Sequence, residues 1–522
     1  MKSIFTLFET VAQRYPQKTA LYVEESFYNY EALAKKANSI AELLPADSSA
    51  FTGLFAHRSI SAFAGVLGIL KSGKGYIPLN PKFPARRIAA ILEQSELNTI
   101  VAEFAFAEKL GEVLNFVNRP LNLVFPFTEN LSQLHRKLFE GHHLIFQSQD
   151  AGAFQQKKPS EKSPYAYMLF TSGSTGIPKG VPVKHEQVRA YVGNINKMFD
   201  FSPEDRFSNT FDLTFDLSVH DLFVTWSNGA TLYCIPGKSL MAPARFIKQH
   251  ELTCWFSVPS LANMMSRLRM LKKDAYPSLR YTLFCGEPLA ESLALKWQQA
   301  APGSRVVNIY GPTEATIGIT AYEIKGESLK SKNGIVSIGK PFSGNAVRIM
   351  DGNRREVKPT EPGELWLTGV QVTEGYWKQP AKTDEAFVFL GGKRYYKTGD
   401  LVQKDEDSEI YYLGRMDFQV KIQGYRVETQ EIDFVIAESS SFENVVTLVF
   451  EDDYKNRKLV TCIAAAEPET SVKEKIYDNC NAKLPDYMIP ERILFFNTIP
   501  LNQNGKTDRN LLKKWAKQAM EK

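Results

Sequence analysis

The pattern of apolar and polar positions predicts a helix at the start of the chain. Within residues 1–16, Ile4, Leu7, Phe8 and Val11 recur at a spacing that places them on one helical face. Polar residues interrupt this segment, so it lacks the continuous apolar core of a signal peptide. No run in the chain approaches the roughly 18 apolar residues of a membrane-spanning helix. We therefore expect no membrane insertion.

Helical patterns alternate with short β-rich runs over residues 28–104. The pattern predicts helices over 59–71 and 84–95, and strands over 76–79 and 98–101. Such alternation is typical of βαβ units, so we expect an α/β fold.

A polar connection and a change of pattern divide the rest of the chain. Residues 147–162 are rich in Gln, Lys and Ser, and a strand-like run follows at 165–170. From Asp417 onwards the chain carries strand and helix signals of its own. A length of 522 residues exceeds a single hydrophobic core. We therefore expect a large α/β domain over 1–416, built of βαβ subdomains, and a small α+β domain over 417–522.

Composition and charge narrow the class of protein. Hydrophobic residues make up 43% of the chain and charged residues 23%, which is ordinary for a globular protein. A formal net charge of +5 is too mild to indicate nucleic-acid binding. The basic stretch 506–522 is either a solvated helix face or a docking surface for an acidic partner. The five cysteines have irregular spacing, so we expect no disulfide framework or zinc site, and a cytoplasmic location.

The strongest chemical motif is a loop rich in hydroxyls and glycines that follows the strand-like run. Glycines let the backbone approach a phosphate, hydroxyls donate hydrogen bonds and a lysine adds positive charge. Pro178 and Gly180 flank the lysine, which distinguishes the loop from the Gly-x-x-x-x-Gly-Lys-Ser/Thr phosphate loop. The residues that we assign to phosphate binding are Thr171, Ser172, Gly173, Ser174, Thr175 and Lys179.

This loop resembles the phosphate-binding signature of the adenylate-forming enzymes, which include acyl-CoA ligases, luciferases and amino-acid adenylation domains. Further segments resemble the other motifs of that family, in the same order along nearly the whole chain. They lie at 308–314, 396–401, 412–417, 421–428 and 502–506. The resemblance implies ATP and Mg²⁺ as cofactors. It also implies a large N-terminal adenylate-forming domain and a small mobile C-terminal domain.

The residue types in these motifs suit a nucleotide. Tyr310 offers an aromatic face to adenine, and Asn308 can hydrogen-bond the edge of the base. Glu314 is a hard oxygen ligand suited to Mg²⁺ on the phosphates. Asp400 can accept hydrogen bonds from the ribose diol, and Arg415 can add a contact to ribose or phosphate. The resemblance adds further candidates for nucleotide binding, which are Gly286, Glu287, Ile309, Gly311, Pro312, Thr313 and Tyr412.

Lys506 is the candidate catalytic residue. When a substrate carboxylate attacks the α-phosphate of ATP, two anions must approach, and an ammonium that bridges them lowers the barrier. In isolation, a lysine in Asn504-Gly-Lys506 is an ordinary turn residue, and the resemblance assigns it to catalysis and to substrate binding. The resemblance also implies that the C-terminal domain rotates about Asp417 between the two half-reactions. This rotation moves Lys506 out of the active site and brings in the 421–428 loop for transfer of the acyl group to a thiol.

Asp216 is the candidate for binding a substrate amine. It stands in a segment that resembles the motif with which amino-acid-activating members of the family hold the α-ammonium group. A carboxylate that faces a pocket at the head of a helix can pair with an amine, although an aspartate at this position could equally be an N-terminal helix cap. Fatty acids and aryl acids have no amine, so Asp216 favours an amino acid.

Segments 255–260 and 282–288 resemble the D-alanine:D-alanyl-carrier-protein ligases, in which a cysteine at the position of Cys285 narrows the pocket. Cys285 is alternatively a small buried apolar residue. Three departures from that pattern leave room for an amino acid other than alanine, either polar or slightly larger. They are His220 in place of an apolar residue, Ile309 in place of a smaller polar residue, and Gly318. His220 is either a pocket residue or a hydrogen-bonded core histidine. We assign to the substrate pocket Asp216, Leu217, His220, Cys285, Ile317 and Lys506.

These observations predict an ATP-dependent ligase that activates D-alanine or a similar small amino acid. We expect a free-standing monomer that transfers the aminoacyl group to the phosphopantetheine thiol of a separate carrier protein. One alternative is a ligase that passes a carboxylic acid to coenzyme A, which would leave the charge of Asp216 unpaired. Another is a non-catalytic nucleotide-binding regulator, which Lys506, Glu314 and Arg415 disfavour.

Overall fold

The structure is a computed structural model that describes most of the chain in two compact units. The described residues are 2–128, 132–146, 163–173, 178–417, 419–440, 442, 444–452, 457–465, 470–501 and 507–521. The first unit comprises Met1–Pro81, Leu92–Phe170 and Gly180–Met416. The second comprises Lys82–Ile91, Thr171–Lys179 and Asp417–Lys522.

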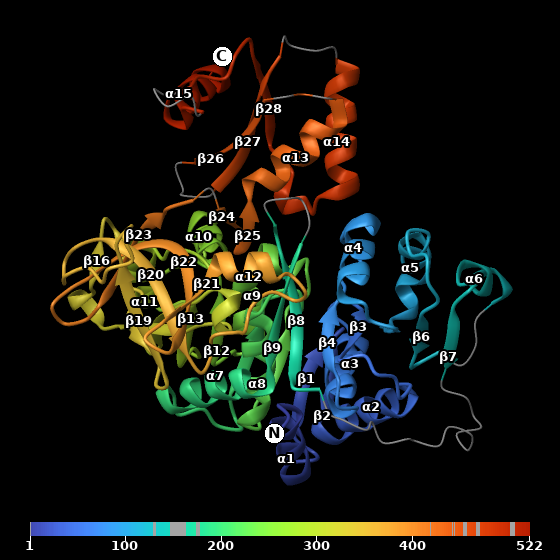
Figure 1. The fold of residues 1–522 in the computed structure, drawn as a ribbon. Helices are drawn as coiled ribbons and strands as arrows, with labels where there is room; N and C mark the ends of the chain where they lie inside the picture. The colour runs from blue at the N-terminus through green and yellow to red at the C-terminus, as the bar shows by residue number, and fades with distance from the viewer. Residues whose placement is uncertain are drawn as a thin grey trace. The chain divides into compact units, whose positions relative to one another are not determined.

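A nine-stranded sheet forms one half of the first unit (Figure 1). Its middle strands, from β1 to β14, run parallel, and antiparallel strands close both edges. In spatial order the strands are β18 (Lys340–Pro341), β15 (Thr320–Ile324), β14 (Arg305–Tyr310), β13 (Tyr281–Phe284), β12 (Cys254–Ser257), β10 (Arg206–Asn209), β11 (Thr231–Cys234), β1 (Thr19–Val23) and β2 (Ser26–Asn29).

A second, seven-stranded sheet runs parallel from β7 to β8. In spatial order its strands are β7 (His143–Phe146), β6 (Asn122–Phe125), β5 (Thr99–Ala102), β3 (Phe51–Phe55), β4 (Gly75–Pro78), β8 (Tyr165–Thr171) and β9 (Lys179–Lys184). Parallel strands need crossover helices, so the alternation of patterns over 28–104 arises from this sheet.

The helices between these strands are α1 (Phe5–Arg14), α2 (Tyr30–Leu43), α3 (Ile60–Lys71), α4 (Ala85–Ser95), α5 (Ala107–Leu114), α6 (Gln133–Leu138), α7 (His185–Met198), α8 (Leu217–Ser227), α9 (Pro243–Gln249), α10 (Pro259–Arg267) and α11 (Glu291–Ala300). Single turns of 3₁₀-helix are η1 (Phe104–Phe106), η2 (Ser239–Met241), η3 (Thr313–Ala315) and η4 (Gly326–Ser328). The helices predicted over 59–71 and 84–95 are confirmed as α3 and α4. Ser59 caps α3 by accepting a hydrogen bond from the amide of Ala62 over 3.2 Å.

A smaller antiparallel sheet completes the first unit. It contains β19 (Asn345–Met350), β20 (Gly363–Gly369), β22 (Lys393–Lys404), β21 (Phe387–Leu390) and β23 (Ile410–Arg415). Nearby in the sequence are the short pair β16 (Ser331–Lys332) and β17 (Ile335–Val336), and helix α12 (Pro380–Ala386). The sheet carries two of the residues assigned to the nucleotide, Asp400 on β22 and Arg415 at the end of β23.

The second unit has its own α+β core. It contains a hairpin, β24 (Gln419–Ile422) and β25 (Tyr425–Glu428), and a three-stranded sheet, β26 (Val445–Glu451), β27 (Arg457–Ala464) and β28 (Arg492–Phe496). The helices are α13 (Thr429–Ser440), α14 (Thr470–Lys483), η5 (Asp486–Met488) and α15 (Arg509–Met520). On α15, Leu512 and Ala516 are buried, whereas Lys513, Lys514 and Lys517 are exposed.

Helix α8 is the buried centre of the first unit. Ten consecutive residues, from Leu217 to Trp226, are buried, as expected for a helix that is apolar on most of its surface. The predicted apolar face of α1 packs on it, because Phe8 makes an edge contact with the ring of Trp226 at 5.4 Å between centroids. Surrounding elements thus fix the helix that follows Asp216.

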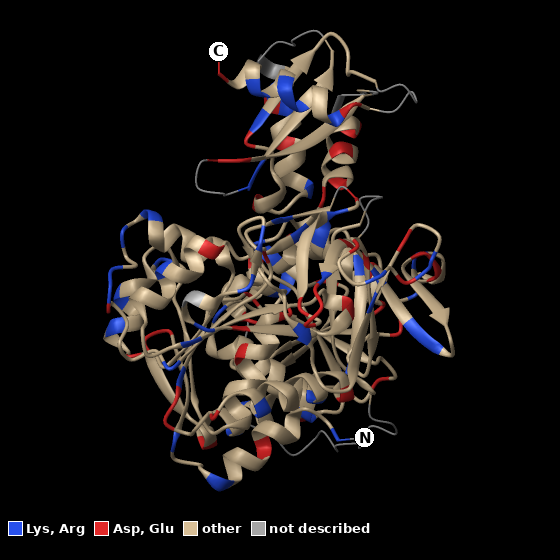
Figure 2. Cartoon of the chain, turned by 90° about the vertical axis from the view of Figure 1, so that its left-hand side faces the viewer, with Lys and Arg blue, Asp and Glu red and all other residues tan. Residues whose placement is uncertain are grey.

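The predicted α/β fold, with its small α+β C-terminal part, is confirmed. Acidic and basic residues are interspersed along the described chain (Figure 2). Within the part of the chain that the structure describes, no helix is long and apolar enough to cross a bilayer. All five cysteines are buried and form no disulfide. The predicted connection over 147–162 lies outside the described residues.

Candidate functional site

In the first unit, the candidate residues follow the carboxyl ends of strands in the nine-stranded sheet. Strands β10, β12, β13 and β14 are parallel neighbours, so their carboxyl ends lie on the same side of the sheet. Ligands of parallel α/β sheets bind at the carboxyl ends of the strands. The segments that follow these carboxyl ends carry residues assigned above, including Asp216 after β10, Cys285 after β13 and Gly311 after β14.

Asp400 is held by two of the other predicted nucleotide residues. Its Oδ1 accepts a hydrogen bond from Arg415 Nη1 over 2.8 Å, and its Oδ2 accepts one from the hydroxyl of Tyr310. Arg415 also donates to the carbonyl of Thr398 over 2.8 Å. Burial raises the pKa of Tyr310 well above its ordinary value, and the charge of Asp400 adds to that effect. The structure therefore brings Tyr310, Asp400 and Arg415 together as a charged cluster.

Glu314 is fully buried in the 3₁₀ turn η3. Its Oε1 accepts a hydrogen bond from the hydroxyl of Tyr376 over 2.7 Å. Asn308, on β14, uses its side-chain amide to donate to the carbonyl of Ser337 over 2.9 Å. A single buried carboxylate suits Mg²⁺, which takes its remaining ligands from water and substrate phosphates. Among the described residues, no group of three or more acidic, His or Cys side chains is arranged to hold a metal.

The backbone after Glu314 adopts an uncommon conformation. Thr316 and Ile317 have φ angles of 56° and 71°, although neither is a glycine. Gln371 stabilises this turn through two hydrogen bonds. Its side-chain amide donates to the carbonyl of Gly318 over 2.7 Å, and its backbone carbonyl accepts from the hydroxyl of Thr316 over 2.6 Å. Strained, over-determined backbone often marks a functional site. Sequence reasoning missed Gln371.

Gly286 and Glu287 follow β13. Gly286 has a φ of 94°, a conformation that favours glycine. Glu287 accepts a hydrogen bond through Oε2 from the amide of Ser260 over 2.8 Å, at the start of α10. The structure therefore gives Glu287 a structural partner, and its assignment to the nucleotide stays a prediction. Tyr412 is half-buried on β23.

Asp216 lies immediately before α8 and is 6% exposed. Its side chain makes no capping hydrogen bond to the first turn of that helix. The structure therefore does not support the alternative that Asp216 is a helix cap. Burial raises the pKa of Tyr76, Tyr167 and Tyr191, and the charge of Asp216 contributes in all three cases. The charge of Asp216 therefore influences buried tyrosine side chains of the first unit.

His220 lies one helical turn after Asp216, as predicted, and is 1% exposed. Its Nδ1 is 2.8 Å from the hydroxyl of Tyr191, on α7. The ring packs against Phe256 at 4.3 Å between centroids. Burial lowers the pKa of His220 to about 3, so the ring is neutral at physiological pH. Tyr191, which the sequence did not single out, is therefore a neighbour of the predicted pocket.

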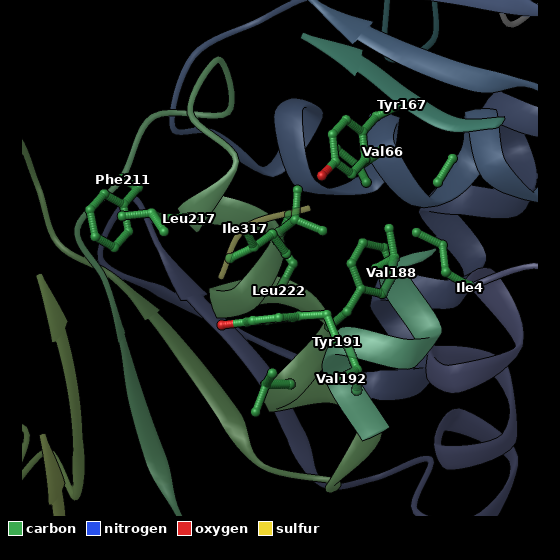
Figure 3. Close-up of a cluster of buried hydrophobic side chains, with 14 of the residues drawn as sticks. Ile4, Val66, Tyr167, Val188, Tyr191, Val192, Phe211, Leu217, Leu222 and Ile317 are labelled. Atoms are coloured by element: carbon green, nitrogen blue, oxygen red, sulfur yellow. The ribbon is translucent and has the colours of Figure 1, made fainter. Parts of the chain in front are cut away.

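Three other predicted pocket residues are apolar and buried, namely Leu217, Cys285 and Ile317. Ile309, which we assigned to the nucleotide, is buried as well. Figure 3 shows Tyr191 projecting from its helix into the cluster that contains Leu217 and Ile317. Ile309 also occupies the space beside Gly318. A Cβ atom on Gly318 would lie 2.3 Å from Cγ2 of Ile309, which is far inside van der Waals contact.

The described part of the predicted phosphate loop belongs to the second unit. The hydroxyl of Ser172 donates to the carbonyl of Arg426 over 2.7 Å, and the amide of Gly173 donates to Glu431 over 3.2 Å. Lys179 forms an ion pair of 3.5 Å with Glu428. Anionic side chains therefore contact a loop that we assigned to an anionic ligand.

A second ion pair in this unit joins Glu431 to Arg87 over 2.7 Å, with both side chains buried. Sequence reasoning missed this pair. Three residues of the predicted site, Ser174, Thr175 and Lys506, lie outside the described residues.

The first unit contains a further pair that the sequence did not predict. His57 Nδ1 lies 3.0 Å from Oδ2 of Asp212, in the segment between β10 and Asp216. Burial alone would raise the pKa of Asp212, but hydrogen bonds from His57 and Thr214 lower it to about 2. Asp212 is therefore ionised, and its pairing with His57 helps to position the segment that leads to Asp216.

Residues 8–377 match the sequence model of a protein family described as "AMP-binding enzyme". This match covers well over half of the 522 residues. It includes the segments that carry Asp216, Tyr310 and Glu314, and ends before Asp400.

Three relatives illustrate the range of similar proteins. The D-alanine–D-alanyl carrier protein ligase of Bacillus licheniformis is 29% identical over 98% of this chain and 99% of its own length. Bacitracin synthase 3 of Bacillus licheniformis is 31% identical over 98% of this chain, which spans only 8% of that protein. The adenylation domain AlmE of Vibrio cholerae, solved with glycyl-adenosine-5′-phosphate, superposes with a TM-score of 0.87, at 27% identity and 98% coverage of both chains.

Proposed function

Because this chain belongs to the family of AMP-binding enzymes, we propose that it activates a small amino acid and loads it onto a separate carrier protein. The chain is an ATP-dependent, AMP-forming ligase of the amino-acid adenylation type. Its first half-reaction joins the amino-acid carboxylate to the α-phosphate of ATP and releases pyrophosphate. In the second, the thiol of a phosphopantetheine group displaces AMP and receives the aminoacyl group.

The observation that carries the choice of an amino acid is the environment of Asp216. Asp216 is 6% exposed and does not cap α8, so its carboxylate is a buried anion that can attract a cationic group of the substrate. The α-ammonium of an amino acid is such a cation and also donates hydrogen bonds. A fatty acid or aryl acid has no such group, so Asp216 favours an amino acid over the alternative of a coenzyme A ligase for such acids.

The nucleotide roles follow from the chemistry of the named residues. We propose that the ring of Tyr310 stacks on adenine and that Asp400, positioned by Arg415, accepts hydrogen bonds from the ribose hydroxyls. Glu314 would hold Mg²⁺, which neutralises phosphate charge when bound. Further proposed nucleotide contacts are Asn308, Ile309, Gly311, Pro312, Thr313, Gly286, Glu287 and Tyr412, and the proposed phosphate contacts are Thr171, Ser172, Gly173, Ser174, Thr175 and Lys179.

Lys506 is the proposed catalytic residue, because its ammonium can draw the carboxylate and the α-phosphate together. We propose domains at 1–416 and 417–522 that work as a monomer and change their relative orientation between the half-reactions. A separate carrier protein is supported by the name of the D-alanyl carrier protein ligase, which this chain matches along nearly its full length.

ATP–pyrophosphate exchange tests this proposal. Exchange is measured with glycine, both enantiomers of alanine and serine, and a fatty acid and an aryl acid as controls. We expect one or more small amino acids to drive exchange and the acids without an amine to fail. The variant Lys506→Ala should lose nearly all exchange, whereas Lys517→Ala, on the exposed face of α15, should retain it. Exchange with the fatty or aryl acid alone, or with none of these acids, would overturn the proposal.

The carrier step is tested separately with a phosphopantetheine-bearing carrier protein and its form without phosphopantetheine. We expect the radiolabelled amino acid to become attached only to the phosphopantetheine form. Attachment to coenzyme A in preference to every carrier protein would contradict this part of the proposal.

A further inference from the structure

The turn after β3 contacts the carboxyl ends of two strands of the nine-stranded sheet. Arg58, in that turn, donates through Nη2 to the carbonyl of Thr210 over 2.6 Å. Its Nη1 donates to the carbonyls of Ile235 over 2.9 Å and Asn209 over 3.4 Å. Asn209 ends β10 and Ile235 follows β11, so one guanidinium joins both strand ends. Thr210 begins the 210–216 segment, which leads from β10 to α8.

The turn that carries Arg58 is held by its own, seven-stranded sheet. Arg58 has a φ of 46°, a left-handed conformation that is uncommon for a residue with a side chain. Such a conformation persists only where the surrounding contacts enforce it. Glu103, directly after β5, accepts hydrogen bonds from the hydroxyl of Ser59 over 2.7 Å and from the amide of His57 over 3.4 Å. These contacts fix the turn from which Arg58 reaches the end of β10.

Asp221, on α8, contacts the start of the same segment. It is 1% exposed, and its Oδ2 accepts a hydrogen bond from the side-chain amide of Asn209 over 3.0 Å. Burial raises the pKa of Asp221 well above its ordinary value. The hydrogen bond from Asn209 and the charge of Arg58 act in the opposite direction, as do the backbone amides of Thr210 and Phe211. Arg58 and Asp221 therefore both act on the residues at which the segment begins.

Hydrogen bonds continue along the segment as far as Asp216. Oδ2 of Asp212 lies 3.0 Å from Nδ1 of His57, in the turn after β3. Oδ1 of Asp212 accepts a hydrogen bond from the hydroxyl of Thr214 over 2.6 Å, and its carbonyl accepts one from the amide of Phe215 over 3.0 Å. Because Phe215 directly precedes Asp216, these contacts determine where the backbone of Asp216 lies.

Charged side chains in this connection indicate a requirement for a defined position. Burying charged groups is costly, and apolar residues of similar volume often stabilise a protein as well or better. Stability alone therefore does not explain why Arg58 and Asp221 hold the segment. A group that positions a substrate has a stricter requirement, because a displacement of about 1 Å can lower a rate about 100-fold.

We propose that Arg58 and Asp221 are positioning residues, which fix the 210–216 segment so that Asp216 meets the substrate amine. In this proposal neither residue contacts the substrate, and both act through the backbone that leads to Asp216. The inference rests on the proposed function and identifies residues on which its amine-binding step depends.

The test measures kcat and KM in ATP–pyrophosphate exchange for ATP, for the amino acid that drives exchange best and for the matching acid without an amine. We expect Arg58→Gln to raise the KM for the amino acid by about tenfold or more and to leave the KM for ATP unchanged. The preference for the amino acid over the matching acid should fall by a similar factor.

Conservative variants separate positioning from folding. Arg58→Lys should retain part of the amino-acid preference, because its ammonium keeps the charge but lacks the fork of donors that joins two strand ends. Asp221→Asn has nearly the same shape as the native side chain, so it should fold. It should raise the KM for the amino acid about fivefold without changing the KM for ATP.

The matched control is Arg280→Gln. Arg280 also joins parts of the nine-stranded sheet, because it donates to Asp205 over 2.8 Å and to the carbonyl of Asp200 over 3.2 Å. Arg280 and Asp205 directly precede β13 and β10, so these contacts lie at the amino ends of the strands. Arg280→Gln should lower Tm and leave the amino-acid preference unchanged.

An unchanged KM for the amino acid in folded Arg58→Gln would overturn the inference, and so would equal effects of Arg58→Gln and Arg280→Gln on the amino-acid preference. If Arg58→Gln does not fold, an unchanged KM for the amino acid in Asp221→Asn would overturn it. These results leave the proposed function standing. Failure of every amino acid to drive exchange in the wild-type protein would instead remove the proposed function itself.

Discussion

Arg415 and Asp400 form a hydrogen-bonded ion pair of 2.8 Å that spans neighbouring strands of the small antiparallel sheet. The hydroxyl of Tyr310, from the nine-stranded sheet, binds the other carboxylate oxygen of Asp400. The two donors fix the orientation of the carboxylate, so under our proposal a ribose would meet a preformed acceptor. Such preorganisation reduces the free energy lost on binding.

Asp400→Asn should therefore weaken ATP binding. The amide removes the negative charge that pairs with Arg415 and replaces one acceptor oxygen with an NH₂ group. We expect the KM for ATP to rise by about tenfold or more, with a much smaller change in the KM for the amino acid. Steady-state exchange kinetics at varied ATP concentration measure both constants.

The matched control is Asp407→Asn, an exposed aspartate that pairs with Lys330. It should leave the KM for ATP unchanged, because exposed ion pairs contribute little. Equal effects of the two substitutions would contradict the assignment of Asp400 to the ribose.

The contact between Ile309 and Gly318 predicts a change of substrate size. Ile309→Ala removes the atoms that fill the space beside Gly318, so a larger amino acid such as valine should gain about tenfold in kcat/KM relative to the wild-type substrate. Gly318→Ala alone should lower activity, and Ile309→Ala should restore it in the double variant. Competition assays with paired amino acids measure these ratios.

Gly237→Ala is the control for the glycine substitution, because a Cβ at Gly237 would meet no atom within 4 Å. It should leave activity unchanged. If Gly318→Ala were as active as Gly237→Ala, the added methyl group would not meet the side chain of Ile309 as the structure indicates.

His185 predicts a loss of stability in mild acid. Burial, followed by the charge of Arg189, lowers the pKa of His185 from 6.5 to about 4. The unfolded chain therefore binds a proton at a higher pH than the folded chain does. The contribution of His185 to stability is present above pH 6.5 and is lost as the pH falls towards about 4. Thermal unfolding should shift to lower temperature over this range.

His185→Gln separates this residue from the other titrating groups, since its amide oxygen can still accept the hydrogen bond that the amide of Ile4 donates to Nδ1. We expect a shallower dependence of Tm on pH than in the wild-type protein. His143→Gln, at an exposed site, should keep the wild-type slope. A wild-type slope in His185→Gln would contradict the prediction.

Local sequence patterns were sufficient to predict many of the helices and strands. The apolar helix α3, with Ser59 before it, and the short strands β4 and β5 have strong local signals, because capping and periodicity depend on adjacent residues. The chemical motifs around Tyr310 and Asp400 could also be assigned, since their residue types suit a nucleotide. Their direct hydrogen bond could not be predicted, because it joins residues 90 positions apart.

Other features depend on tertiary packing that leaves no local signal. Tyr191 lies 29 positions from His220, and nothing near it in the sequence indicates a polar partner. Thr316 and Ile317 adopt positive φ angles without a glycine, because Gln371 stabilises the turn from a distant segment. The pairing of His57 with Asp212 depends in the same way on contacts between segments that follow strands of different sheets.

The most direct test of the account compares an amino acid with its deaminated analogue. Exchange is measured for the best amino acid of the panel and for the matching acid without an amine, in the wild-type protein and in Asp216→Asn. The account predicts strong exchange with the amino acid alone, a loss of about 100-fold in Asp216→Asn, and an unchanged KM for ATP. Equal exchange with the deaminated acid, or full amino-acid exchange in folded Asp216→Asn, would contradict the claim that Asp216 binds the substrate amine.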